Sequence, residues 1–227
     1  MERDFSLMSQ KQLQLIKFDY HTERIAKLKE CSRLNQYFLN QIVQEHAAMF
    51  ETDKLPNGQQ IMRPVQVKPG DVYKMRATLK SFYREWSKEG FSEREQSFTP
   101  IIAEVEAYFR EQGKPAYDPA TGHRLSVLHP GCGMGRLVFE FAVRNFRSQG
   151  NEFAYFMLLA SNFILNSSQR SDQFQLFPFI HNWSNLKRSE QAFQPISVPD
   201  VCPNEHLSAT ESDFSMVAGE FIEVYQN

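Results

Sequence analysis

A glycine-rich segment, LHPGCGMGR at residues 128–136, constrains the fold of this chain more than any other feature. The apolar residues 125–128 before the glycines predict a short buried strand, and residues 137–143 after them predict a helix. A strand that ends at glycines and continues as a helix points backbone N–H groups into the turn. Because only glycine allows so tight a turn and the close approach of a ligand, this unit indicates a nucleotide-binding α/β fold.

Glu152 supports this interpretation. It lies 21 residues after Gly131, at the end of a second predicted strand over residues 146–152. In nucleotide-binding folds a carboxylate at this distance binds the ribose hydroxyls. A plain strand–helix connector remains the structural alternative for the turn.

Composition excludes several classes of protein. The 227 residues are 41% hydrophobic, so they can bury the core of one large domain or of a domain with a helical extension. A net charge of −2 gives no general attraction to nucleic acid or to membranes. Three scattered cysteines and six histidines without ligand spacing predict neither disulfides nor a metal site. We expect a soluble protein of a reducing compartment, in the cytoplasm and also in the nucleus, with no signal peptide or membrane span.

The first half of the chain reads as helical. Residues 10–50 carry one apolar stripe: Ile25, Leu28, Cys31, Leu34, Phe38 and Ile42. A breaker at residues 55–58 and an extended loop over residues 61–70 follow. Asp71 is predicted to cap a second helix, which ends at Gly90 and presents Val72, Met75, Leu79, Phe82 and Trp86.

A third helix is predicted after Pro100. Ser92 and Glu95 fit a capping box ahead of it, and its inward residues are Ile101, Ile102, Val105, Tyr108 and Phe109. A linker over residues 113–122 then divides a helical region, residues 1–115, from a nucleotide-binding region, residues 116–227. In the second region we expect a helix over 153–166, a packed aromatic insertion over 167–210 and a third strand over 214–220.

Several motifs together resemble the carnosine N-methyltransferase family. They follow one another in the family's order: the glycine turn, QGNE at 149–152, SNF at 161–163, PDV at 199–201, FSM at 214–216 and AGEF at 218–221. Upstream, REWS at 84–87 matches the family's helical segment. The resemblance covers residue 72 to the C-terminus.

The resemblance implies an α/β fold, with a helical N-terminal region followed by the first half, about three strands, of a Rossmann-like methyltransferase sheet. It implies binding of S-adenosylmethionine and methylation of the imidazole of carnosine to give anserine, or of a related histidine-containing dipeptide. Gly131 would lie against the methionine and ribose, Glu152 would hold the ribose hydroxyls, and Arg84 would reach the cofactor carboxylate. A nicotinamide cofactor is the alternative ligand, but the order Gly-Cys-Gly-Met-Gly is more similar to methyltransferases.

Two positions depart from the family pattern. The adenine-side pair is Glu220-Phe221 where the family has Asp-Phe, and Ser81 stands where the family has a glutamine. The family's substrate-side aspartate, histidine and tyrosines would follow the third strand, so we expect a chain truncated at its C-terminus and assign no catalytic residue. Without a fourth strand, the first strand would have an unpaired edge.

Other residues have two interpretations each. Cys132 suits a crowded turn better than a reactive thiol, and Trp86 suits core packing. Trp183 lines either a core or an active site, His181 either accepts a proton or is structural, and His129 is structural.

Three functions compete. The first is a dipeptide N-methyltransferase. The second is an inactive short form that binds the cofactor weakly. The third is a scaffold that forms homodimers through its N-terminal helices.

Overall fold

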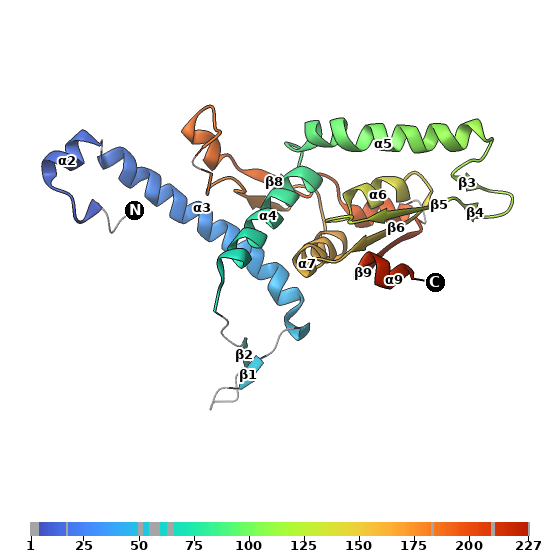
Figure 1. The fold of residues 1–227 in the computed structure, drawn as a ribbon, viewed down its shortest axis with the longest axis horizontal. Helices are drawn as coiled ribbons and strands as arrows, with labels where there is room; N and C mark the ends of the chain where they lie inside the picture. The colour runs from blue at the N-terminus through green and yellow to red at the C-terminus, as the bar shows by residue number, and fades with distance from the viewer. Residues whose placement is uncertain are drawn as a thin grey trace.

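The computed structural model describes residues 5–16, 18–49, 52–54, 60–62, 66–182, 184–209 and 212–226. Long helices occupy the N-terminal region, and a three-stranded parallel sheet with short flanking helices follows, so the fold is mixed α/β (Figure 1). No helix within the described residues has the length and apolarity needed to cross a membrane.

The first predicted helix is divided into three parts. These are α2 (Gln10–Leu15), α3 (Phe18–Glu45) and the 3₁₀ turn η1 (Ala47–Met49). In α3 the predicted stripe faces inward, with Ile25, Cys31, Phe38 and Ile42 buried and Leu28 and Leu34 half-buried. Figure 1 shows α2 and the start of α3 projecting away from the sheet.

The predicted loop over residues 61–70 and the predicted helix cap at Asp71 are both wrong, because a small hairpin reaches into this segment and the helix begins earlier. Strands β1 (Thr52–Lys54) and β2 (Gln60–Met62) pair antiparallel, and the predicted breaker at 55–58 lies outside the described residues. Helix α4 (Pro69–Trp86) begins two residues before Asp71 because proline suits the first turn of a helix. Asp71 is therefore inside the first turn, where its carboxylate accepts from the Lys68 backbone N–H at 3.0 Å.

Helix α5 (Phe91–Glu111) corrects the prediction for the third helix. Gly90 is the N-cap of α5 and does not end α4, and Ser92 lies inside the helix instead of capping it. Pro100 lies in the helix interior. The residues that pack inward are Phe98, Ile102, Val105 and Phe109, while the predicted inward residues Ile101 and Tyr108 are exposed.

The predicted strand–turn–helix–strand unit is present. Strand β5 (Ser126–Pro130) leads through the glycine turn to α6 (Arg136–Ala142), and β6 (Arg147–Glu152) follows. Strand β9 (Phe214–Ala218) completes the parallel sheet in the order β5-β6-β9, and α9 (Phe221–Tyr225) follows it. Among the described strands β5 pairs only with β6, so one of its edges is unpaired.

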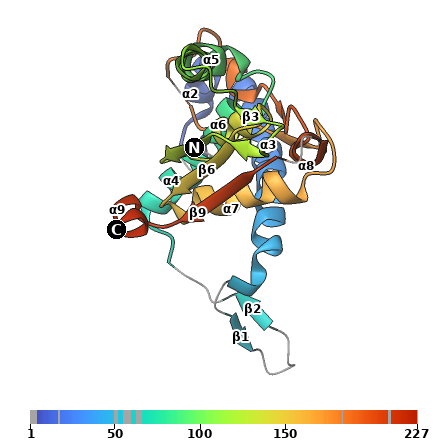
Figure 2. The same cartoon turned by 90° about the vertical axis from the view of Figure 1, so that its right-hand side faces the viewer.

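The remaining elements lie next to the sheet or next to helices α3 and α4 (Figure 2). A hairpin of β3 (Tyr117–Asp118) and β4 (His123–Arg124) occupies the predicted linker. Helix α7 (Tyr155–Asn162) continues into the π-helical segment η2 (Phe163–Ser167). The predicted insertion contains β7 (Phe174–Leu176), η3 (Ser189–Phe193), β8 (Ile196–Val198) and α8 (Pro203–Ala209), and β7 pairs with β8.

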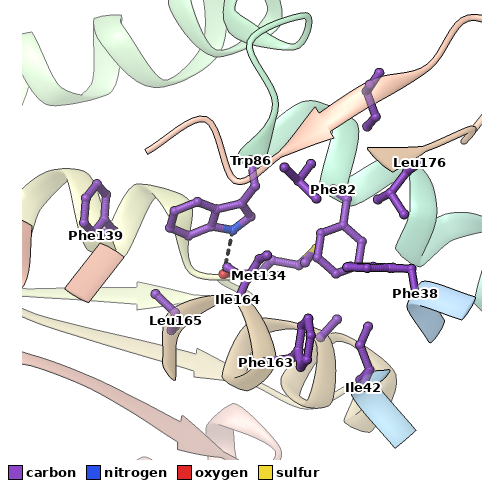
Figure 3. Packing of buried hydrophobic residues seen from close by; sticks show 13 residues of the cluster. Phe38, Ile42, Phe82, Trp86, Met134, Phe139, Phe163, Ile164, Leu165 and Leu176 are labelled. Carbon is purple, nitrogen blue, oxygen red and sulfur yellow. Dashed lines mark hydrogen bonds between the residues drawn. The ribbon is translucent and has the colours of Figure 1, made fainter. Parts of the chain in front are cut away.

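One hydrophobic core combines side chains from both sides of the predicted boundary at residue 115. Phe38 of α3, Phe82 and Trp86 of α4, and Phe139 of α6 belong to the same buried cluster, together with η2 and the β7–β8 pair (Figure 3). Trp86 is fully buried there, so the packing interpretation is confirmed. The division into two domains stays a prediction.

Candidate functional site

The glycine turn adopts the backbone conformation that its sequence requires. Gly131, Gly133 and Gly135 have φ angles of 62°, 61° and 80°, in the left-handed region that side chains disfavour. The turn connects the carboxyl end of β5 to the first residue of α6. Gly131 has open space where a Cβ would stand, so a ligand can approach its backbone closely.

Two carboxylates bind the N–H groups that the sequence analysis expected to face a ligand. Glu85 of α4 accepts from the backbone N–H of Met134, at 3.1 Å for its nearer oxygen, and from that of Arg136 at 3.4 Å. Glu152 accepts from the N–H of Gly133 at 2.9 Å. The turn is therefore held in shape by acidic side chains from α4 and β6.

Glu85 is a site residue that sequence reasoning did not find. Burial raises its pKa to about 7, and the backbone N–H groups of Met134 and Arg136 only partly offset this effect. The REWS motif contains Glu85, but its partners lie about 50 residues further along the chain. Only the packing of α4 against the turn reveals this contact.

A cleft of about 950 Å³ opens beside the turn, at the carboxyl ends of β5 and β6. It brings together three of the predicted cofactor residues, Arg84, Gly131 and Glu152. Ser81 also lines it and accepts from the Arg84 guanidinium at 3.3 Å. Apolar side chains, Leu128, Leu137, Phe156 and Met157, form part of the wall. A ligand with a carboxylate and vicinal hydroxyls fits this combination of groups.

Glu152 retains part of its capacity to accept hydrogen bonds. One oxygen accepts from the N–H groups of Phe153 and Ala154 at 2.9 and 2.8 Å, and the other accepts from Gly133. An ionised carboxylate offers about four acceptor positions. The oxygen that binds Gly133 can therefore accept one further hydrogen bond from a ligand in the cleft.

Comparison with known proteins decides the family. A family model described as carnosine N-methyltransferase matches residues 61–227. The chain belongs to this family. The carnosine N-methyltransferase of Rattus norvegicus is 39% identical over 228 residues, which cover 99% of this chain and 53% of that protein.

Two further members of the carnosine N-methyltransferase family give the same result. A Drosophila melanogaster protein, carnosine N-methyltransferase unmet, is 35% identical over 240 residues, 97% of this chain and 50% of that protein. The Schizosaccharomyces pombe carnosine N-methyltransferase is 40% identical over 154 residues, 68% of this chain and 39% of that protein. The chain spans about half the length of the rat and Drosophila relatives.

The family motifs outside the cleft hold its framework together. Ser161 of the SNF motif donates to the Met134 carbonyl at 3.0 Å, and the Trp86 indole donates to the same carbonyl at 3.2 Å. Asp200 of the PDV motif lies buried between two guanidiniums, at 2.7 Å from Arg94 and 2.6 Å from Arg136. These residues fix the turn and α6 against α4 and α5.

The structure does not bring Glu220 and Phe221 into the wall of the cleft. Glu220 caps α9 and accepts from the Glu223 N–H at 3.1 Å, and Phe221 packs against Tyr225. Both follow β9 at the carboxyl edge of the sheet, where Ala218 pairs with Glu152. Their adenine-side role stays a prediction.

The remaining candidates divide into groups inside and outside the cleft. Burial raises the pKa of Cys132 to about 12, with Glu152 and Glu85 adding to the effect, so the thiol stays protonated as a packing residue. Burial lowers the pKa of His129 to about 4, and its ring hydrogen-bonds Ser148 at 3.0 Å, which supports a structural role. His181 lines neighbouring hollows but not the cleft. Trp183 lies outside the described residues.

Proposed function

We propose that this chain binds S-adenosylmethionine in the cleft beside the glycine turn, as the cofactor-binding part of a methyltransferase. One observation carries the proposal: Arg84, Gly131 and the spare acceptor of Glu152 line the same cleft. In this proposal β5, β6 and β9 are the first half of a Rossmann-like methyltransferase sheet. The substrate is carnosine, giving anserine, or a related histidine-containing dipeptide.

Each residue has a distinct part in binding. The cofactor, when bound, supplies a methyl group on a positively charged sulfur. Arg84 binds the carboxylate end through its planar guanidinium, and Glu152 accepts from a ribose hydroxyl. Gly131 lets the ligand lie against the backbone, and Glu85 keeps the turn in the shape that receives it. The contribution of these residues is alignment of the reactants, which is a major source of rate enhancement.

The test of cofactor binding is calorimetry with S-adenosylmethionine. Glu152→Ala should weaken binding more than tenfold, because a hydrogen bond to a charged group contributes about 1.5–3 kcal/mol. Glu111→Ala is the matched control, since Glu111 is an exposed carboxylate at the end of α5 that does not line the cleft. Equal affinity of the Glu152 variant and the wild type would refute the role of this carboxylate.

A second experiment separates cofactor binding from catalysis. Incubation with carnosine and methyl-labelled cofactor, at enzyme concentrations near that of the substrate, should place label in the dipeptide. Binding without transfer of label would favour the inactive short form over the enzyme. Dimerisation through the N-terminal helices and the cellular location stay predictions, which light scattering and imaging would test.

A further inference from the structure

A second hollow, of about 520 Å³, lies next to the cofactor cleft and shares Arg84 and Glu93 with it. One side is the surface of α4, and the other is the segment that carries Phe179 and His181. None of the residues predicted for the cofactor other than Arg84 lines this hollow. It is therefore a separate space with a different set of side chains.

Three basic residues of α4 line the hollow on one face of the helix. Arg76, Lys80 and Arg84 are spaced four residues apart, so their side chains lie one above the other. Like charges at this spacing destabilise a helix. The face extends over roughly 12 Å, because a helix rises about 1.5 Å per residue.

The positive charges of these three side chains have few hydrogen-bond or ion-pair partners within the protein. Within the described part of the chain, Arg76 and Lys80 form no hydrogen bond or ion pair, and Arg84 has one long bond, to the Ser81 hydroxyl. Among the described residues that line the hollow, Glu93 of α5 is the one acidic side chain. Three positive charges and one negative charge therefore face the same space.

The rest of the wall is aromatic and carries one neutral histidine. Tyr83 and Phe179 pack edge to face with their ring centroids 5.0 Å apart and form a rigid aromatic side. Burial, together with the positive charges of Arg76 and Lys80, lowers the pKa of His181 to about 4. The imidazole is therefore neutral at pH 7 and adds a polar contact without charge.

We propose that this hollow is an anion-binding site for a small molecule that carries two or more negative charges on phosphate or carboxylate groups. A single charge would not match three cations spread over two helical turns, whereas a multivalent anion neutralises the like charges together. The hollow shares Arg84 with the proposed cofactor cleft, whereas Arg76 and Lys80 line the hollow and not the cleft. A titration without cofactor therefore tests this site separately from the proposed function.

Titration of the whole chain with pyrophosphate or with citrate, without cofactor, tests the site by calorimetry. We expect measurable binding of at least one probe, at least tenfold weaker in the double variant Arg76→Gln/Lys80→Gln, and weaker at high salt. Lys74→Gln is the matched control, because Lys74 is an exposed lysine of α4 outside the hollow. It should bind like the wild type.

The two probes also identify the chemistry of the ligand. Preference for pyrophosphate assigns a phosphate ligand, and preference for citrate assigns a carboxylate ligand. A two-dimensional NMR titration of the wild type adds a readout that needs no variant, since resonances of Arg76, Lys80 and His181 should move together. No binding of either probe at about 10 mM, shifts elsewhere in the chain, or equal binding by the double variant would overturn the proposal.

Discussion

Two groups of basic residues in this protein differ in almost every physical respect. The guanidiniums of Arg94 and Arg136 are about 7% exposed and both bind the carboxylate of Asp200. The face formed by Arg76, Lys80 and Arg84 is open to a hollow, and in the described part of the chain no carboxylate forms an ion pair with it. Each guanidinium of the first group is in contact with a buried carboxylate, whereas the second group has no such partner among the described residues.

This difference separates structural cations from cations that are available to ligands. Arg136 lies 5.0 Å above the Trp86 ring and donates to the Glu85 carbonyl at 2.9 Å, so it connects α6 to the end of α4. Arg94 donates to the carbonyls of Arg84 and Ser87, both at 2.8 Å. The REWS and PDV motifs of the family therefore meet in one buried network next to the glycine turn.

The largest expected effect comes from breaking this buried network. Asp200→Asn removes the charge between Arg94 and Arg136, and removal of one partner of a buried pair costs about 3–5 kcal/mol of unfolding free energy. Urea denaturation measures it. In the control Asp172→Asn, the ion pair with Lys88 is exposed and the loss should be below about 1 kcal/mol. Equal losses in the two variants would show that burial does not distinguish the pairs.

The sequence predicted the glycine turn and its strands because their signals are local. Positive φ at three glycines, an apolar strand and a mostly apolar helix are each encoded within a few residues. The observed β5, α6 and β6 lie within one or two residues of the predicted ranges. The pairing of Glu85 with the turn, in contrast, depends on how α4 docks, and no local signal encodes it.

Helix α5 shows why tertiary packing can override a local rule. Proline was predicted to begin a helix, yet Pro100 lies inside α5 because buried groups on both sides of it hold the helix in place. Arg94 binds Asp200 before the proline, and Phe98 and Ile102 pack against the α6 side of the sheet around it. The missing hydrogen bond at Pro100 is outweighed by these contacts.

Glu85 gives the next largest effect, and it depends on pH. Its pKa is about 7 in the folded protein and about 4.5 without burial, so the folded state binds more protons between these values. The contribution to stability is therefore complete below pH 4.5 and is lost as the pH rises through 7. Relative to Glu85→Gln, the wild type should lose on the order of 3 kcal/mol of unfolding free energy between pH 4.5 and 8.

Urea denaturation of the wild type and of Glu85→Gln at several pH values measures how the difference in their unfolding free energies changes with pH. His129 and His181 act in the opposite direction, since their pKa values near 4 destabilise the folded state as the pH falls below 6.5. Both histidines are present in the wild type and in Glu85→Gln, so their effect cancels in the comparison. A difference between the two proteins that does not change with pH would contradict the raised pKa of Glu85.

The smallest expected effect is a gain in stability, and it comes from the face formed by Arg76, Lys80 and Arg84. Lys80→Gln removes two like-charge pairs from α4, each worth about 0.2–0.5 kcal/mol, and glutamine has a similar helix propensity. We expect the variant to be more stable than the wild type, in contrast to Asp200→Asn. Lys74→Gln, which loses an attractive partner in Asp71 at 3.9 Å, should be slightly less stable.

A bound anion should reverse the order of Lys80→Gln and the wild type. Saturating pyrophosphate or citrate stabilises the folded state of the protein that binds it, by an amount that grows with the ratio of ligand concentration to Kd. Thermal melts with and without the anion measure both signs. If the wild type is already the more stable protein without anion, contacts within the chain compensate Lys80, and the two basic groups differ in exposure alone.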